Sequence, residues 1–145
     1  MMVVTAAAAG ERAGCLVGFA TQCSIHPPRF AVWISRQNHT FDVARRSPVL
    51  AVHFLSVDDR PLAELFGGQT GDEMDKFGRC RWREGAGGAP VLEDCARWFA
   101  GHVIEQIPTD DHVGFLLAPV QVESAPWSGQ LGFQAARSIS PGHDA

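Results

Sequence analysis

The sequence has little positive charge and no long apolar run. Lys and Arg together number 12 against 16 Asp and Glu, a formal net charge of -4, and they form no basic run of the kind that binds a phosphate backbone. We therefore expect no nucleic-acid partner. Every apolar stretch is shorter than the roughly 18 residues that a membrane-spanning helix needs, so we expect no membrane partner either.

The N-terminal stretch, MMVVTAAAAGERAG, is apolar but lacks the features of a secretory signal. No cationic residue precedes its apolar run, and the polar residues Glu11 and Arg12 follow at once. This pattern favours an internal strand. We expect a cytoplasmic protein.

The cysteines and histidines are too scattered for a metal site. The four cysteines, at positions 15, 23, 80 and 95, include no C-x-x-C pair, and the six histidines include no H-x-x-x-H pair. We therefore predict no metal. The cysteines are expected to be free thiols that pack as small apolar side chains.

The motifs of several common catalytic sites are missing too. The chain has no G-x-S-x-G elbow, no P-loop and no G-x-G-x-x-G fingerprint. The acidic pairs Asp58–Asp59 and Asp110–Asp111 stand in loop or cap contexts, where solvated carboxylates are the ordinary interpretation. These absences favour ligand binding over acid–base hydrolysis.

Short β-prone runs separated by turn residues dominate what the chain does contain. Six or seven strands are expected, with a loop longer than two residues between the first two. This count favours one domain of the all-β class, β-rich with short helices. The expected strands cover residues 3–6, 15–21, 30–35 and 49–56, parts of 89–107, residues 112–124 and a short piece of the tail.

Two short helices interrupt these strands. One is expected over residues 40–46 with Asn38 or Thr40 as its cap. The other is expected over 56–68, where Ser56 and Asp59 have capping-box spacing. The polar, glycine-rich residues 69–89 are predicted to form a long functional or mobile loop.

Two stretches within residues 16–42 each allow a ligand-binding interpretation and a purely structural one. Arg36, Asn38 and Thr40 stand where a strand turns into a helix, which suits a phosphate but also an ordinary helix cap. The small and apolar residues 16–24 suit a flat ring but are also typical of a core strand.

Eight short motifs follow one another along most of the chain, from about Val3 to Val122. They are VVTA, S-x-x-P-P at 24–28, N-x-T at 38–40, AVHFLS, LAELFGG, DKF, GAPVLEDCARWF and DDHVGFLLAPV. Their order and spacing resemble the flavin reductase-like, FMN-binding split-barrel family. The resemblance implies a six-stranded split β-barrel. We expect this domain over residues 1–135 and a flexible C-terminal tail over 136–145.

The resemblance also implies an activity. Members of the family are usually homodimers that bind FMN or FAD with the ring near the subunit interface, reduce it with NADH or NADPH, and supply it to a partner flavin-dependent monooxygenase. Because hydride passes directly between two stacked rings, no catalytic triad is needed. The alternative is a non-catalytic split barrel, holding a flavin, deazaflavin or haem, that acts as an electron carrier or sensor.

The resemblance assigns roles to residues of this chain. Asn38 and Thr40, helped by Arg36, match the family's phosphate binders, and His112 in DDH matches a catalytic histidine near the nicotinamide. The residues that match the flavin-ring surroundings are Leu16, Val17, Gly18, Phe19, Gln22, Cys23 and Ser24, with His53 beside the ring and Lys76 and Phe77 on a loop that closes over the site.

Several of these positions also have a plain structural interpretation, and some depart from the family pattern. His112 could be a surface or interface residue, and His53, where the family often has Asn, a core histidine. Asp110 replaces the glycine of a G-D-H motif. Near the end, Phe133, Gln134 and Arg137 match a C-terminal family motif whose histidine is absent.

Overall fold

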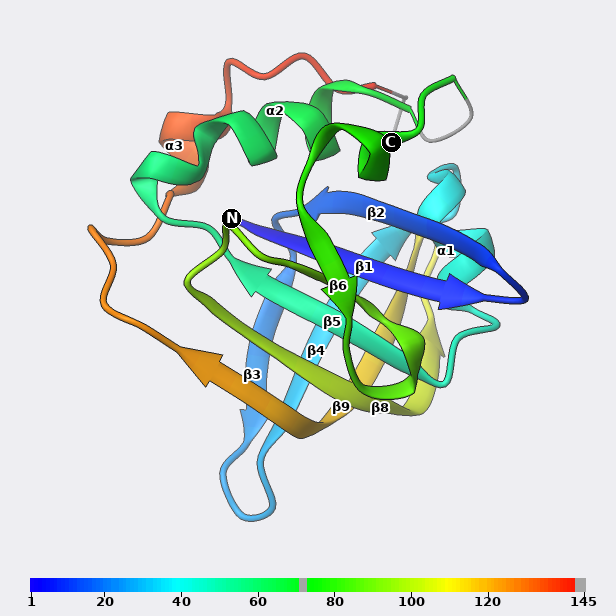
Figure 1. Cartoon of the computed structure of the whole chain (residues 1–145). Helices are drawn as coiled ribbons and strands as arrows, with labels where there is room; N and C mark the ends of the chain where they lie inside the picture. Colours follow the sequence, from blue (N-terminus) through cyan, green and yellow to red (C-terminus); the bar gives the residue numbers. More distant parts are fainter. Residues whose placement is uncertain (71–72, 143–145) are drawn as a thin grey trace.

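A computed structural model describes residues 1–70 and 73–142 of the chain. Its main element is a seven-stranded antiparallel sheet with strand order β2-β1-β5-β8-β9-β4-β3. The sheet curls into a barrel (Figure 1). Its strands are β1 (Met2–Ala8), β2 (Glu11–Val17), β3 (Ala20–Ser24), β4 (Arg29–Ser35), β5 (Val49–Phe54), β8 (Arg97–Pro108) and β9 (His112–Ser124).

One bent stretch of chain joins the two edges of this sheet. Strand β2 pairs with β1 and strand β3 pairs with β4, and only Gly18 and Phe19 separate β2 from β3. The backbone N–H of Trp33 donates to the Phe19 carbonyl at 2.9 Å, which holds the bend against β4. Counted as one bent strand, β2 and β3 give the six strands expected of a split barrel, and the predicted β-rich class is confirmed.

The turn between β1 and β2 differs from the prediction. We expected a loop longer than two residues, but only Ala9 and Gly10 connect the strands. Both have positive φ, 50° and 78°, which is the backbone that a tight type I′ hairpin turn requires at its two central positions. The expectation was wrong because Ala9, an unfavoured residue for this turn, hides the signal.

Two apolar layers stabilise the fold. The barrel interior is filled by residues such as Val4, Val32 and Phe115, all fully buried. A second cluster, which includes Phe66 and Leu131, lies between the sheet and the helices α2 (Arg60–Gly68) and α3 (Phe133–Ala136). These helices cover one end of the barrel (Figure 1).

Both predicted helices are confirmed, with shifted bounds. Helix α1 (His39–Ala44) is capped by Asn38, whose side chain accepts a hydrogen bond from the Thr40 N–H. Helix α2 is preceded by the 3-10 turn η1 (Val57–Asp59), where the predicted capping box of Ser56 and Asp59 is present.

The polar segment 69–89 contains more structure than a loop. Strand β6 (Trp82–Glu84) pairs with β7 (Pro90–Leu92), and two 3-10 turns flank β6, η2 (Lys76–Arg79) and η3 (Ala86–Gly88). Because β6 has only three residues, its sequence carries too little alternation to be recognised. Residues 71 and 72 lie outside the described residues.

The C-terminal part folds back on the second layer. The short strand expected there is a single bridge between Ser56 and Gln130, followed by the unpredicted helix α3. Ala136 is buried, and the Gly142 N–H donates to the Gly67 carbonyl at 3.0 Å. The predicted flexibility of 136–145 stays a prediction, and residues 143–145 lie outside the described residues.

Residues 1–70 and 73–142 contain neither a helix suited to crossing a membrane nor a cluster of metal-binding side chains. No helix there combines the length and apolar character that a membrane crossing needs. Nor do three His, Cys, Asp or Glu side chains come together there as a metal site would require. All four cysteines are free thiols.

His53 links three strands inside the molecule. Its Nδ1 lies 3.1 Å from the Val3 carbonyl of β1, and its Nε2 accepts the Leu92 N–H of β7 at 3.0 Å. The ring is therefore a neutral tautomer with the proton on Nδ1. Burial lowers the pKa of His53 from its ordinary 6.5 to about 4.

The titration of His53 predicts a pH-dependent stability. Because the unfolded chain binds this proton near pH 6.5 and the folded chain only near pH 4, the free energy of unfolding should fall by roughly 3 kcal/mol between these values. Urea unfolding at several pH values measures this loss. His53→Asn should flatten the dependence and the exposed His102→Asn should not; equal slopes in both variants would contradict the account.

Candidate functional site

A cavity of about 450 Å³ lies between the bent strand and the helical layer. We call it the roofed cavity. Its wall comes from the end of β2 and the bend, its side from the end of β4 and the start of β9, and its roof from α2, α3 and the residues after α3. The lining residues are Met1, Cys15, Leu16, Val17, Gly18, Phe19, Trp33, Ile34, Ser35, Asn38, Phe66, Gly67, His112, Phe133, Ala136, Arg137, Ile139 and Pro141.

Six of the predicted site residues line this cavity together. They come from distant parts of the sequence, which the barrel brings to one place. They are Leu16, Val17, Gly18, Phe19, Asn38 and His112. The ring wall predicted from the first four residues and the histidine predicted near the nicotinamide thus face the same space.

Close packing holds the wall against the helical layer. A Cβ atom built on Gly67 of α2 would come within 2.7 Å of the Leu16 side chain. Only glycine therefore lets α2 lie this close to β2 without a shift of Leu16. Behind the wall, burial raises the pKa of the Cys15 thiol to about 11, so it stays protonated and unreactive at neutral pH.

His112 is oriented by its neighbours on both sides. Its Nδ1 lies 2.8 Å from a carboxylate oxygen of Asp111, and its ring lies 5.3 Å from the Phe19 ring. The hydrogen bond with His112 is also the main cause that lowers the pKa of Asp111. An Nδ1–H donated to Asp111 leaves Nε2 as the ring nitrogen for a ligand.

The predicted phosphate residues do not meet in one place. Asn38 lines the roofed cavity, but Thr40 is buried behind it, 2% exposed. The guanidinium of Arg36 donates to the carbonyls of Thr109 and Asp110, both at 3.2 Å, and so holds the turn between β8 and β9. A common phosphate site was predicted because these residues are close in the sequence, but successive side chains at the start of a helix point in different directions.

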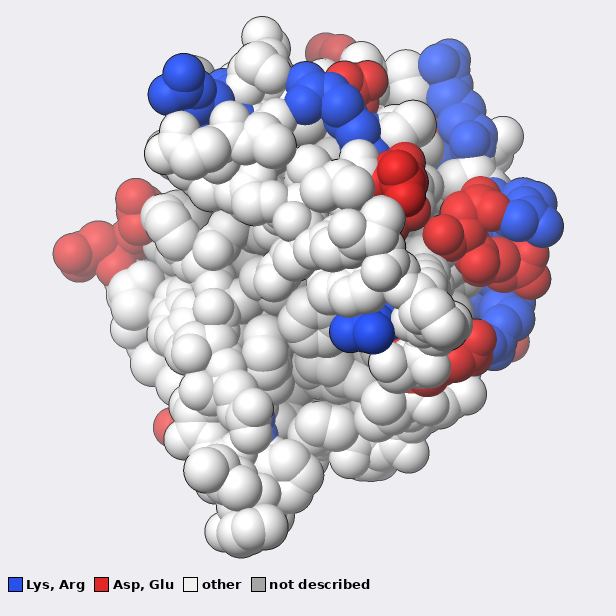
Figure 2. Space-filling view, turned by 90° about the vertical axis from the view of Figure 1, so that its left-hand side faces the viewer, with Lys and Arg blue, Asp and Glu red and all other residues white. Residues whose placement is uncertain are grey.

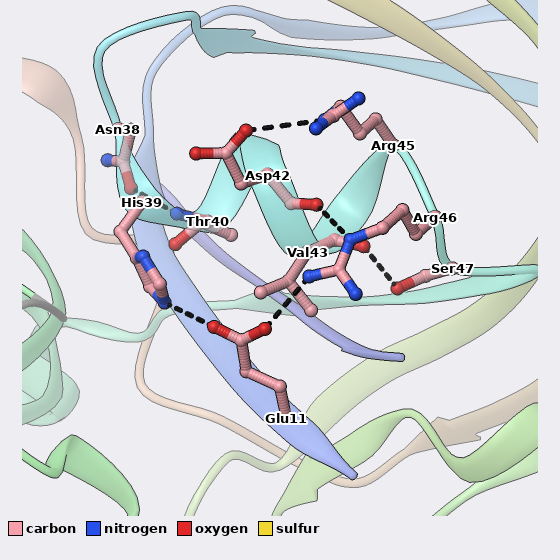
Figure 3. A network of polar contacts seen from close by, with 9 residues as sticks. All are labelled: Glu11, Asn38, His39, Thr40, Asp42, Val43, Arg45, Arg46 and Ser47. Carbon is pink, nitrogen blue, oxygen red and sulfur yellow. Dashed lines mark hydrogen bonds and ion pairs between the residues drawn. The ribbon is translucent and has the colours of Figure 1, made fainter. Parts of the chain in front are cut away.

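An ion-pair network fixes helix α1 beside the cavity (Figure 3). The Glu11 carboxylate lies 3.0 Å from Nε2 of His39 and 2.8 Å from Nη2 of Arg46. The start of β2 is thereby joined to the first residue of α1 and to the segment just after α1. This network positions Asn38 rather than contacting the roofed cavity itself.

The other predicted residues lie elsewhere. Gln22 lines a different cavity beside the β3–β4 hairpin, and Cys23 is exposed on β3 close to Ser24. His53 is the buried core histidine described above. None of the four is among the described residues that line the roofed cavity.

Lys76 and Phe77 line a separate cavity of about 540 Å³ beside the first half of β2. The Lys76 ammonium group donates to the Gly14 and Phe66 carbonyls at 3.1 and 3.2 Å, and the residue is 5% exposed. It therefore ties α2 to β2. Neither residue lines the roofed cavity, so the loop does not close over it in this structure.

The roof was missed as part of the site. Phe133 and Arg137 match a family motif. The only further sequence pattern that could have predicted a helix in this tail is the spacing of Ala136 and Ile139. Arg60 of α2 holds this roof, because its guanidinium donates to the Ala135 carbonyl at 2.6 Å and the Ser138 hydroxyl at 2.9 Å. Among the described lining residues, Arg137 is the one Lys or Arg.

The arrangement suits a planar ligand. Flat apolar walls with a few directed polar groups are typical of cofactor sites, and here those groups are the Asn38 amide, the His112 imidazole and the Arg137 guanidinium. The cavity combines an apolar wall, an aromatic corner and one positive charge, which together match a ring with an anionic substituent.

Comparisons with known proteins agree with this geometry. The profile of the "Flavin reductase like domain" matches residues 1–135. The FMN reductase (NADH) RutF of Bradyrhizobium diazoefficiens is 30% identical over 110 residues, which are 76% of this chain and 61% of that protein. The RutF of Variovorax paradoxus is 31% identical over 111 residues and is also covered to 61%. The chain thus spans 61% of the length of these two curated relatives.

Solved structures share the fold. A crystal structure of the FMN-binding protein from Thermus thermophilus with bound 1-cyclohex-2-enone has a TM-score of 0.79 and 25% identity, over 85% of this chain and 68% of that one. The Streptomyces globisporus C-1027 NADH:FAD oxidoreductase SgcE6 has a TM-score of 0.78 and 21% identity, over 90% and 77% of the two chains. Since the family profile covers residues 1–135, the chain belongs to the flavin reductase like domain family.

Proposed function

We propose that this chain is an NAD(P)H:flavin oxidoreductase that binds FMN in the roofed cavity and supplies reduced flavin to a partner monooxygenase. The observation that carries the proposal is the flat wall of residues 16–19 facing the same cavity as His112. The relatives named FMN reductase (NADH) support FMN as the flavin and NADH as the donor. Four free cysteines fit a reducing compartment, so we place the activity in the cytoplasm.

The chain's own residues bind and orient the ring. A bound flavin supplies the hydride chemistry between nicotinamide and flavin. The side chains of Leu16 and Val17 offer an apolar surface, and Gly18, without a side chain, lets a ring edge approach the backbone amides. His112, held by Asp111, directs one ring nitrogen toward the ligand.

We further propose that Arg137, not Arg36, neutralises the FMN phosphate. Arg137 lines the roofed cavity, and its one protein hydrogen bond recorded among the described residues is to Gln134, at 3.2 Å through Nη1. Arg36 is already engaged with two backbone carbonyls outside the cavity. Asn38 would contact the same polar end of the ligand.

A homodimer completes this proposal. Phe19 and Phe133 both line the roofed cavity, and both are 64% exposed. Large apolar side chains at this exposure favour cover by another surface. We propose that a second copy of the chain packs there and shields the flavin from water.

Anaerobic mixing with NADH or NADPH tests the activity. The protein should bind FMN, and either nicotinamide should bleach the visible flavin absorbance of the complex. Tight FMN binding without bleaching by either donor would favour an electron carrier or sensor and contradict the reductase. His112→Gln should slow the bleaching tenfold or more at saturating FMN, because the imidazole that Asp111 orients near the transferred hydride is lost, whereas the exposed His102→Gln should leave the rate unchanged.

FMN and riboflavin differ only in the phosphate, so a comparison of their binding tests the role of Arg137. Arg137→Gln should weaken FMN binding by about 1.5 to 3 kcal/mol, the usual contribution of a charged hydrogen bond, and leave riboflavin binding unchanged. Calorimetric titration measures both affinities. Arg36→Gln is the matched control: a selective loss of FMN affinity in that variant instead would restore the phosphate site predicted from the sequence.

A further inference from the structure

Another cavity, separate from the two described above, opens in the side of the barrel. We call it the barrel mouth; its volume is about 570 Å³. It lies where the β3–β4 hairpin, the start of β8, the end of β9 and the segment 124–130 meet, and among the described residues none lines both this cavity and the roofed cavity. Figure 2 shows the side of the molecule on which these elements lie, and much of that surface carries no charged side chain.

Aromatic rings form the inner wall of the barrel mouth. Phe30, Phe54 and Phe99 contact one another with ring centroids 5.3 to 6.1 Å apart. All three pack on the interior core, which holds their rings in place. The wall is therefore preformed, and a flat ring that enters can meet aromatic edges and faces in the favoured tilted geometries.

Two guanidinium groups line the same cavity. The Arg97 guanidinium lies over the Trp127 ring at 4.5 Å, and its Nε donates to the Ala125 carbonyl. Its Nη1 and Nη2 have no hydrogen-bond partner among the described residues, and Arg29 uses only Nη1, toward the Pro28 carbonyl. Several charged N–H donors thus remain for a ligand.

The acid at the barrel mouth does not cancel this charge. Glu123 lines the cavity, but its carboxylate is paired with Arg83 at 3.0 Å. With Arg29 and Arg97 both positive, the mouth carries an excess of positive charge beside an aromatic wall. An occupant should therefore be flat, apolar over most of its surface and anionic at one edge.

We propose that the barrel mouth is a second binding site, for a planar aromatic carboxylate of one or two rings. The aromatic wall would take the ring, and Arg97, with Arg29, would take the carboxylate, because the guanidinium fork matches its two oxygens. The cavity volume lies within the usual range for small-molecule sites. This site is separate from the proposed flavin site, since the described residues that line the two cavities do not overlap.

Titration with 2-naphthoate and its neutral analogue 2-naphthamide tests the proposal. Naphthoate should bind one site per chain, detected by calorimetry and by a change in tryptophan fluorescence, with the same affinity in the presence and absence of saturating FMN. Arg97→Gln should weaken naphthoate binding at least tenfold and leave the weaker naphthamide binding unchanged. Arg81→Gln, at an exposed arginine outside the mouth, should change neither.

Several results would overturn the proposal. They are the absence of saturable naphthoate binding, competition of naphthoate with FMN, and an equal loss in the Arg97 and Arg81 variants. Sedimentation of the same samples detects a second copy in the mouth: dissociation of a dimer by naphthoate would assign this surface to the subunit interface. If Arg97→Gln fails to fold, Arg29→Gln provides the same comparison.

Discussion

The bend at Gly18 and Phe19 is the constraint on which the rest of the structure depends. One stretch of chain pairs with β1 before the bend and with β4 after it, so the two edge strands of the sheet, β2 and β3, continue into each other. The two edges of the open sheet meet at this bend. The bend also divides the predicted flavin stretch, because residues 16–19 face the roofed cavity while Gln22 lies at the barrel mouth.

The helical layer depends on this strand in turn. Lys76 and Gly67 let α2 lie directly on β2, and Arg60 extends the layer to the roof over the cavity. Glu11 at the start of β2 contacts His39, next to Asn38, and Arg46 just after α1 (Figure 3), so this strand also anchors the helix that Asn38 caps. A single strand thus provides the wall of the site and anchors its polar side.

Most strands and helices could be predicted from local sequence patterns, whereas the composition of the site depends on contacts between residues that are distant in the sequence. The strands, the Asn38 cap and the capping box at Ser56 follow from neighbouring residues, which is why they could be predicted. The order of the motifs predicted residues 16–19 as the ring wall and His112 as a site residue. The family resemblance predicts Arg36 and His53 at the flavin. In the structure neither lines the roofed cavity, because Arg36 is hydrogen-bonded to backbone carbonyls and His53 is buried in the core. The roof depends on tertiary contacts with α2, which no local pattern records.

The central claim is that the bend and the roof enclose the flavin. Amide hydrogen exchange with and without FMN tests it most directly, because ligand contact slows the exchange of the amides that it covers or stabilises. We predict slower exchange with FMN at residues 16–19 and 133–141 and no change at residues 22–30. Protection at residues 22–30, with none at 16–19, would contradict the account.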